Sequence, residues 1–395
     1  MDPLQLVGSE LSPYTGKVRA YLRYKGIQFD PVQSSHEIHE NILKPNVGWK
    51  VVPVIITPDG KYVQDSTEII HYLEKLHPLP SIYPQTPCQR IVSMLLELYA
   101  DEWLVLPIMH YRWSFKENLP FINQEFGSTV LPKETASVQR ERAKMAMAYF
   151  SSMLPVLGIN KESIPEIERG YLELLDNLSK HFEVYPFLLG FKPCIADFAM
   201  HGMLYAHLYR DPYPGYIMKQ RAPLVCAWIE KMNQFTKDRL MYTHSIKDGK
   251  ITLDQLNRNQ QDFLPDDQIP QTLFPILETI FQNQAPEILD NCNILRIYLK
   301  DHPDAKRLPR ILGTHRFKIG QTISTRGSMT YPIWMLQSIS DYYYSLPGKM
   351  SLTVDKFLEK FEGAKEFVGV DLDTCRVQRI NNYVCPEQIR KQSKL

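Results

Sequence analysis

A serine at the start of a predicted helix is the first residue whose type and position could do chemistry. Ser12 precedes Pro13, a pair typical of the N-cap and first position of a helix. A helix start carries partial positive charge and free N–H groups, which stabilise an anion. A thiol with a pKa of ~8.5 is mostly protonated at neutral pH, although only its thiolate attacks electrophiles. Ser12 is therefore a candidate for holding a bound thiolate, although simple capping is the ordinary role of such a serine.

Two further motifs suit a peptide that carries such a thiol. Val52-Pro53 interrupts a β-rich run, as expected if Pro53 begins a strand after a cis peptide bond. The backbone of Val52 could then pair with an extended peptide as an added strand. Asp65 and Ser66 open a second predicted helix, whose N–H groups suit a carboxylate, and Gln64 could add a contact. A thiol site, a peptide site and a carboxylate site together describe the binding of glutathione, a tripeptide.

The elements that must position these residues follow a thioredoxin-like α/β order over the first ~80 residues. A strand, a helix and a strand come first, and a hairpin and a helix follow. The segments are Leu4–Val7, Ser12–Gly26, Ile27–Val32, a hairpin turning at Pro58-Asp59-Gly60, and a helix with Ile69, Ile70, Leu73 and Leu76 at apolar spacing.

The family that this arrangement resembles is the glutathione transferases, which carry an active serine, a cis-proline loop and an acidic-Ser γ-glutamyl site in this order. The matching segments are Ser12-Pro13-Tyr14, Val52-Pro53-Val54 and Gln64-Asp65-Ser66. The first segment is most similar to the Ser-Pro-Phe of the tau class, whereas the omega class and the glutaredoxins have a cysteine in place of the serine.

The resemblance implies roles for these residues. Ser12 would activate glutathione, Val52 would pair with its cysteinyl backbone, and Asp65 and Ser66 would hold its γ-glutamyl end. A lysine usually contacts the glycyl carboxylate, and the candidates here are Lys44 and Lys50, of which Lys50 is preferred.

Residues 88–240 predict a second, all-helical domain after a proline-rich linker. Its segments Pro186–Gly190 and Cys194–Phe198 resemble the family's Phe-Leu-x-Gly and Ser-x-Ala-Asp motifs, the second of which is an N-capping box. Cys194 replaces the hydroxyl residue, and a thiol is a poor acceptor, so we expect a weakened box in which Asp197 still folds back. The resemblance covers roughly residues 4–235.

Aromatic and histidine side chains near the predicted thiol site could line a pocket for an apolar electrophile. The candidates are Tyr14, His110 and Trp113. Packing between helices is the commoner role of such residues, and Arg112 is then expected to pair with a carboxylate.

Residues 265–395 form an additional, mostly helical region of unknown function, which makes a three-domain division of 1–80, 88–240 and 265–395. Its predicted segments are helix-like sequence at Leu273–Leu299, a strand at Thr314–Ile323, and helices at Ile333–Tyr344 and Val354–Phe361. Its arginines could hold an anion or acidic residues of the same domain: Arg307, Arg310, Arg316 and Arg326. Its aromatic residues Trp334 and Tyr342-Tyr343-Tyr344 are expected in the core.

Composition narrows the function classes further. The chain has 395 residues and a net charge of +1, which gives no bulk attraction to nucleic acid or to a membrane surface. No apolar run is long enough to span a bilayer, the N-terminus lacks a secretion signal, and the dispersed cysteines indicate free thiols in a reducing compartment. His36 and His39 lack a third metal ligand. We therefore expect a cytoplasmic protein without a metal, or a peroxisomal one if Ser393-Lys394-Leu395 acts as a eukaryotic targeting signal.

Three functions are consistent with the sequence. The first is a glutathione transferase, a detoxification enzyme in which the glutathione thiol attacks a small electrophile, in a chain that could form a homodimer. The second is a binding or structural protein that keeps the fold without turnover. The third is a glutathione-dependent reductase or isomerase, against which the absence of cysteine at Ser12 and Thr15 argues.

Overall fold

A computed structural model describes residues 3–234, 242–255 and 262–387. The chain divides into two compact units: unit 1 is Met1–Leu154 with Ile167–Ile276, and unit 2 is Pro155–Glu166 with Leu277–Leu395. The first two domains predicted from the sequence both fall in unit 1, and the short segment Pro155–Glu166 clusters with the C-terminal part. The predicted targeting tripeptide Ser393-Lys394-Leu395 lies outside the described residues.

Unit 1 begins with a sheet that, within the described residues, has four strands in the order β2-β1-β3-β4. The central strand β1 (Leu4–Gly8) pairs in parallel with β2 (Phe29–Gln33) and antiparallel with β3 (Val54–Ile56). β4 (Tyr62–Gln64) returns antiparallel to β3 after the turn at Gly60. The thioredoxin-like order predicted from the sequence is confirmed.

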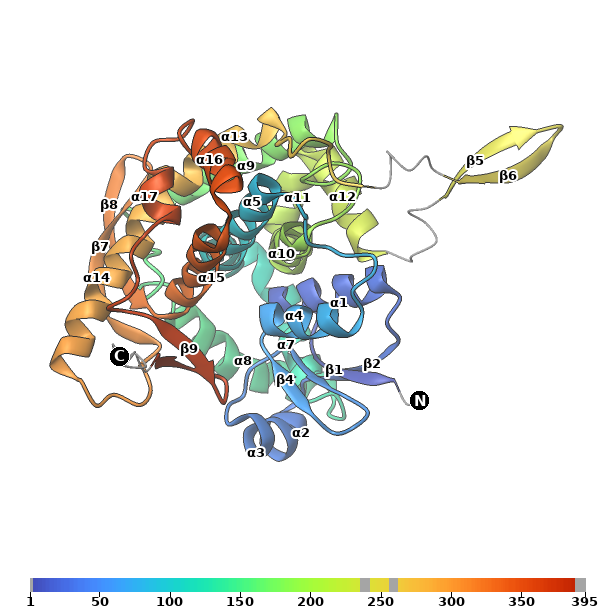
Figure 1. Cartoon of the computed structure of the whole chain (residues 1–395). Helices are drawn as coiled ribbons and strands as arrows, with labels where there is room; N and C mark the ends of the chain where they lie inside the picture. The colour runs from blue at the N-terminus through green and yellow to red at the C-terminus, as the bar shows by residue number, and fades with distance from the viewer. Residues whose placement is uncertain (1–2, 235–241, 256–261, 388–395) are drawn as a thin grey trace. The chain divides into compact units, whose positions relative to one another are not determined.

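Helices cover both faces of this sheet, because successive side chains of a strand point to opposite faces. Val7 and Val54 form a core with Leu43 and Val47. On that face lie α2 (His36–Ile38), η1 (His39–Leu43) and α3 (Lys44–Val47), and on the other lie α1 (Pro13–Lys25) and α4 (Ser66–Leu76), as Figure 1 shows. The predicted apolar face of α4 is buried at Ile69, Ile70 and Leu73, whereas Leu76 in its last turn is 56% exposed.

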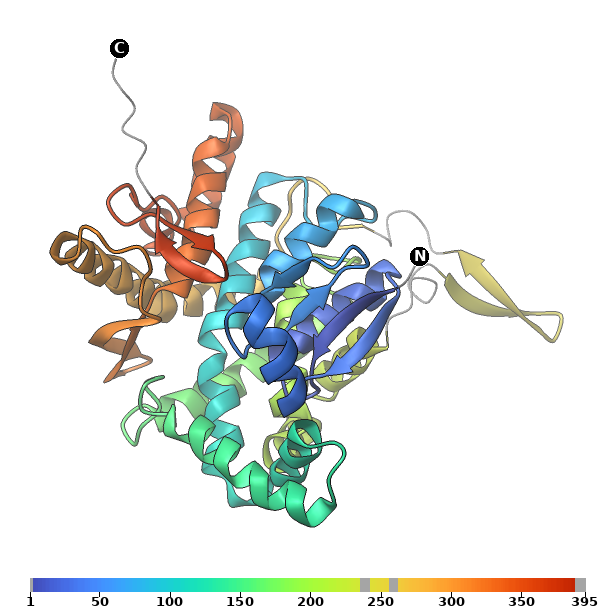
Figure 2. The ribbon, with the colours of Figure 1, turned by 90° about the horizontal axis from the view of Figure 1, so that it is seen from below.

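The rest of unit 1 is mainly helical, as predicted. α5 continues into the π-helical turn η2, and α6 follows after the single turn residue Leu104; together they form one long column, cyan to teal in Figure 2. The helical segments are α5 (Pro87–Leu98), η2 (Tyr99–Trp103), α6 (Val105–Ser114), η3 (Lys116–Asn118), α7 (Leu119–Val130), α8 (Ala136–Ser152), α9 (Ile164–Phe182), α10 (Ile195–Met203), η4 (Leu204–Tyr209), α11 (Pro212–Arg221), α12 (Pro223–Asn233) and η7 (Gln271–Leu273).

The N-cap of α10 contains the cysteine that replaces the usual hydroxyl residue. Both halves of the capping box form, and Asp197 folds back as predicted. One Asp197 carboxylate oxygen accepts the Cys194 N–H at 2.9 Å and the thiol at 3.3 Å, and the other accepts the Leu188 N–H at 3.0 Å. Burial raises the pKa of Asp197 to about 6. The thiol thus also acts as a donor, a role that the sequence analysis did not consider.

A hairpin follows α12 at a place where the sequence indicated only an interruption. β5 (Tyr242–Lys247) and β6 (Lys250–Gln255) pair antiparallel around Asp248-Gly249, whose φ angles are 51° and 71°. Asp-Gly with positive φ at both positions is the usual connection of a two-residue hairpin. Lys247-Asp248-Gly249 carries the turn signal in the sequence, but the two strands on either side of it were not predicted.

Unit 2 combines helices with two hairpins, of which β9–β10 is red in Figure 2. The unit boundary falls within α13 (Phe274–Thr279). The following elements of unit 2 are η8 (Ile280–Gln284), α14 (Ala285–Asp301), β7 (Ile311–Ile319), β8 (Thr322–Met329), α15 (Tyr331–Ser345), α16 (Gly348–Leu358), α17 (Ala364–Val368), β9 (Val377–Ile380) and β10 (Tyr383–Pro386).

Two expectations for this unit need correction. The strand predicted over Thr314–Ile323 turns at Gly320, with φ 56°, so the segment contains the end of β7 and the start of β8. Tyr344 was expected in the core but is 64% exposed, because it lies in the last turn of α15, and Trp334 is half-buried.

Candidate functional site

Ser12 lies between β1 and α1 and is the N-cap of the helix, as predicted. Its oxygen accepts the Thr15 N–H at 3.1 Å, and Pro13 occupies the first helical turn. The residue is half-buried. Because the bond to Thr15 uses only a lone pair, the hydroxyl proton can be donated to an anion bound at the helix start.

The second and third predicted motifs lie at the neighbouring elements of the same sheet. The Val52-Pro53 peptide bond is cis, and β3 begins at the next residue. Asp65 is the N-cap of α4, with Oδ1 accepting the N–H groups of Thr67 at 3.0 Å and Glu68 at 3.2 Å. Its φ of 88° is rare for a residue with a side chain, and such outliers concentrate at functional sites.

The lysines proposed for a carboxylate contact both lie beside one acidic side chain. Lys50 forms an ion pair with Glu40, and Lys44 lies 3.6 Å from the other oxygen of the same carboxylate. The hydrogen bond from Lys50 lowers the pKa of Glu40. Both lysines are exposed, so the choice between Lys44 and Lys50 stays a prediction.

A buried lysine that the sequence analysis missed joins the two helix starts. Lys17 of α1 lies 3.0 Å from the Thr67 hydroxyl, 2.7 Å from Glu97 and 2.6 Å from Asp101. Burial raises the pKa of Asp101 to about 7, against the opposing charge of Lys17. The network fixes α1 and α4 to the long helical column of α5 and η2. No local pattern marks Lys17, because its partners come from three other elements.

The three candidate pocket residues lie in different surroundings. Tyr14, two residues after Ser12, donates its hydroxyl to the Asp101 carbonyl at 3.0 Å. Trp113 packs against a core that includes Leu11, the residue directly before Ser12. Tyr14 and Trp113 therefore both place aromatic rings close to the start of α1.

His110 contacts another group of residues. Its Nε2 lies 2.8 Å from Glu168 and its Nδ1 lies 3.0 Å from the Ser114 hydroxyl, with Tyr111 and Phe115 beside the ring. Burial lowers the pKa of His110, and Glu168 opposes this shift. The His110 ring thus packs between neighbouring side chains, which is the commoner role that the sequence analysis gave as the alternative to a pocket residue.

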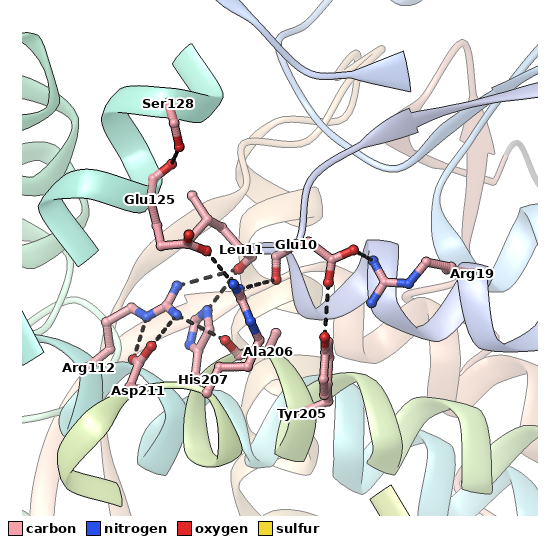
Figure 3. Close-up of polar contacts among 11 residues, drawn as sticks. Glu10, Leu11, Arg19, Arg112, Glu125, Ser128, Tyr205, Ala206, His207 and Asp211 are labelled. Atoms are coloured by element: carbon pink, nitrogen blue, oxygen red, sulfur yellow. Dashed lines mark hydrogen bonds and ion pairs between the residues drawn. The ribbon is translucent and has the colours of Figure 1, made fainter. Parts of the chain in front are cut away.

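Arg112 pairs with a carboxylate, as expected from the sequence. Its Nε and Nη2 donate to the two Asp211 oxygens at 2.7 and 2.6 Å, and both residues are buried. Figure 3 shows that the same guanidinium points towards Leu11. No local pattern in the sequence marks Asp211 as this carboxylate.

Several other features bear on the class of protein. Within the described ranges, no three acidic, histidine or cysteine side chains gather as a metal site would require. All six cysteines are free thiols. Across the same ranges, no helix combines the length and apolarity that a membrane span needs.

Comparison with known proteins finds similarity in the N-terminal part of unit 1. Residues 6–81 match the family model described as "Glutathione S-transferase, N-terminal domain". Among curated proteins, the chain is 32% identical to Glutathione S-transferase U18 of Arabidopsis thaliana over 108 residues, which is 26% of this chain and 47% of that protein. It is 27% identical to a probable glutathione S-transferase of Nicotiana tabacum over 103 residues, 26% of this chain and 46% of that protein. The match therefore spans about half the length of these relatives.

Two solved structures align with part of this chain. Beta-etherase LigF from Sphingobium aligns at a TM-score of 0.43 and 22% identity over 60% of this chain and 98% of its own. A glutathione S-transferase from Methylobacillus flagellatus with glutathione bound aligns at a TM-score of 0.37 and 21% identity, over 60% of this chain and 97% of its own.

Proposed function

We propose, from the match of residues 6–81 to the glutathione S-transferase N-terminal family model, that the chain binds glutathione and activates its thiol at Ser12. The observation that carries the proposal is the place of Ser12 at the N-cap of α1, with an oxygen that accepts from Thr15 and a proton left to donate. The helix start and this hydroxyl together stabilise a thiolate, which lowers the pKa of the thiol. The thiol proton passes to water, and the thiolate sulfur then forms a bond to an electrophilic carbon. The bond from that carbon to its leaving group breaks, and the leaving group departs with the electron pair, as chloride does from 1-chloro-2,4-dinitrobenzene.

The rest of the tripeptide would be held by the neighbouring motifs. Val52, before the cis-proline Pro53, pairs with the cysteinyl backbone, and β3 starts directly after it. The γ-glutamyl end binds at the start of α4, where Asp65 caps the helix and Ser66 is its first residue, with Gln64 beside them. Lys50 remains the proposed contact for the glycyl carboxylate.

The electrophile would enter beside Tyr14 and Trp113. Trp113 packs near Leu11 and Tyr14 follows Ser12, so an apolar molecule next to these rings lies close to the thiolate. His110 enters this proposal only as a residue of the same helix as Trp113, since its ring is engaged with Glu168 and Ser114.

The proposed activity is the transfer of glutathione to an electrophile, and not the reduction of a disulfide. Reduction by a glutaredoxin-like route needs an attacking cysteine at the helix start, and that position holds Ser12. A protein that binds glutathione without turnover is the alternative that the following experiment separates.

The test measures glutathione binding by calorimetry and turnover with 1-chloro-2,4-dinitrobenzene for wild type, Ser12→Ala and Ser152→Ala. Ser152 is a matched control, because it is exposed and its hydroxyl donates to the Tyr149 carbonyl at the end of α8. We expect Ser12→Ala to keep glutathione binding and to lose turnover by about 10²-fold, the usual range for removal of one donor to a developing anion. Ser152→Ala should match wild type. Turnover that does not depend on Ser12 contradicts the role of this residue, and absent binding contradicts the proposal.

A further inference from the structure

Residues 8–11, which are the last residue of β1 and the loop after it, lead to the start of α1 and so decide where Ser12 lies. Two of their carbonyl oxygens are held locally. The Gly8 carbonyl accepts the Ser34 N–H at 2.9 Å, and the Ser9 carbonyl accepts the Ser12 N–H at 3.2 Å. Backbone carbonyls in a folded chain are nearly always paired, so the partners of the other two show what else fixes the loop.

The remaining two carbonyls are held by side chains of the helical part of unit 1. Arg210 Nη1 donates to the Glu10 carbonyl at 3.1 Å. The Leu11 carbonyl lies 3.0 Å from His207 Nε2 and accepts a longer hydrogen bond, at 3.4 Å, from Arg112 Nη1. Figure 3 shows Arg112 and His207 converging on Leu11. Residues about 100 to 200 positions away thus fix the peptide that leads into Ser12.

The donors are themselves fixed in place. Arg112 makes a bidentate pair with Asp211 and also donates to the Ala206 carbonyl at 3.0 Å. Arg210 forms an ion pair with Glu125. A bidentate arginine–carboxylate pair sets the plane of the guanidinium as well as its position. The loop therefore contacts preorganised groups rather than flexible surface side chains.

His207 acts as a neutral donor. Burial lowers its pKa well below the ordinary value, and the nearby Arg112 lowers it further. A neutral imidazole has one N–H, while the two ring nitrogens face the carbonyls of Leu11 at 3.0 Å and Ile108 at 3.3 Å. The shorter contact assigns the proton to Nε2 and the hydrogen bond to Leu11.

We propose that Arg112, His207 and Arg210 are positioning residues that tune the thiol pKa of glutathione at Ser12, an inference that rests on the proposed function. They draw the carbonyls of Glu10 and Leu11 away from the start of α1. A carbonyl oxygen that rotated towards this start would bring partial negative charge beside the thiolate and would displace the Ser12 hydroxyl. Both changes destabilise the anion, so the helical part of unit 1 controls the reactivity of a thiol bound by the thioredoxin-like part.

Substitution of Arg112 by lysine separates this role from charge. The Asp211 pair already neutralises the guanidinium, so Arg112→Lys preserves the net charge of the centre. A lysine ammonium has no planar fork, and it cannot bond both Asp211 oxygens, Ala206 and Leu11 in the present geometry. Arg221→Lys is the matched control, because Arg221 makes a bidentate pair with Asp176 at 2.8 and 2.6 Å on the exposed side of the same helical part.

The experiment titrates the ultraviolet absorbance of the thiolate in the glutathione complex and measures kcat and KM across pH. For Arg112→Lys we expect the bound thiol pKa to rise by about one unit, so kcat falls about tenfold below that pKa and recovers at high pH. The KM for glutathione should stay within about twofold, because the peptide contacts are made elsewhere. A purely structural defect would lower the active fraction equally at every pH. Arg221→Lys should reproduce the wild-type titration.

A second variant covers the case in which Arg112→Lys does not fold. Arg210→Gln removes the bond to the Glu10 carbonyl at a partly exposed position, and we expect a smaller rise of the thiol pKa in the same direction. An unchanged thiol pKa in the folded variant contradicts the inference. The proposed function is judged separately, in the wild-type protein, by whether glutathione binds and whether its thiolate depends on Ser12.

Discussion

Each unit contains a buried arginine with a carboxylate and a histidine, and the two groups are built differently. The Arg112 centre of unit 1 consists of Arg112, Asp211 and His207. Arg112 and Asp211 form a bidentate ion pair at 2.6 and 2.7 Å. The ring nitrogens of His207 lie 3.0 Å from the Leu11 carbonyl and 3.3 Å from the Ile108 carbonyl. A short, doubly bonded pair recovers much of the cost of burying two charges.

The Arg326 centre of unit 2 consists of Arg326, Glu287 and His315. Arg326 and His315 are cross-strand partners on β8 and β7, and their side chains lie 3.5 and 3.7 Å from the same Glu287 oxygen. Arg326 also stacks on Phe317 at 5.4 Å. Among the described residues, Arg326 Nε and Nη1 and both nitrogens of His315 have no hydrogen-bond partner.

The difference shows that burial alone does not indicate what a charged group contributes. Both arginines have side chains only 2% exposed. Arg112 makes two short hydrogen bonds to Asp211 and a third, at 3.0 Å, to the Ala206 carbonyl, so its guanidinium is well paired. Arg326 is attracted to Glu287 without hydrogen bonds of normal length, so much of its desolvation cost is not recovered. We therefore expect substitutions in the Arg112 centre to lower the free energy of unfolding strongly, and removal of both charges from the Arg326 centre to change it little.

The largest expected effect is the removal of one partner from the Arg112 centre. Asp211→Ala leaves a buried, unpaired guanidinium, which costs about 3–5 kcal/mol of unfolding free energy. Urea denaturation, followed by hydrogen exchange of the amides in unit 1, measures this loss. The double variant Arg112→Met/Asp211→Leu removes both charges and should recover most of it.

The control for this prediction is the exposed pair in the same helical part. Asp176→Ala breaks an equally short bidentate bond to Arg221, but both side chains are more than 40% exposed, and we expect at most about 1 kcal/mol. A loss below about 1 kcal/mol for Asp211→Ala would remove the distinction drawn between the two centres.

The next largest effect concerns the close packing of α10 against the start of α1, which involves no charged group. A Cβ on Gly202 of α10 would lie 2.3 Å from the Pro13 carbonyl oxygen and 3.0 Å from the Lys17 nitrogen, both backbone atoms. Gly202→Ala should therefore cost about 1–3 kcal/mol through overpacking, measured by urea denaturation. Gly170→Ala in α9 meets open space and should stabilise by up to about 1 kcal/mol. Equal effects at both glycines would show that helix packing does not hold Ser12.

The parts of the candidate site that the sequence predicted are those that local chemistry determines. The N-cap of Ser12, the helix end at Gly26, the cis-proline at Pro53 and the N-cap of Asp65 each depend on a few neighbouring residues. The strand order of the thioredoxin-like part follows from these local segments, because short connections leave few alternatives.

The parts that the sequence could not predict depend on contacts between distant segments. Arg112 was expected to find a carboxylate, but its partner lies 99 positions away. His110 was grouped with Trp113 because they share a helix, although helix geometry turns the two side chains towards different neighbours. Lys17 looked like an ordinary helix residue, and only the assembled column of α5 and η2 makes it a buried ion-pair centre.

The pH dependence of stability extends the comparison to the two histidines. Burial lowers the pKa of His315, with Arg326 adding to the shift while Glu287 and Asp290 oppose it, and burial also lowers that of His207. Above the unfolded value of ~6.5 neither state holds the proton. Below it the unfolded state takes up the proton first, so stability falls with pH by up to about 1.4 kcal/mol per unit and per histidine until the folded pKa is reached.

This sign gives a specific test in unit 2. Hydrogen exchange of the β7 and β8 amides at pH 7 and pH 5 should show lower protection at pH 5, and His315→Gln should reduce that difference. The decline in unit 1 should continue to lower pH, because the pKa of His207 is lowered further. Protection in β7 and β8 that is independent of pH in wild type would contradict the neutral state of His315.

The smallest expected effect is the neutralisation of the Arg326 centre. Arg326→Met with Glu287→Gln removes both charges and keeps an oxygen for the Asn291 amide, which donates to Glu287 at 2.9 Å. Because the pair makes no hydrogen bonds of normal length, we expect the free energy of unfolding to change by less than about 1 kcal/mol, or to rise. Urea denaturation and exchange of the β8 amides measure this change. A loss as large as that of Asp211→Ala would mean that the long contacts around Arg326 stabilise as much as the bidentate pair of Arg112, and the contrast between the two centres would then be wrong.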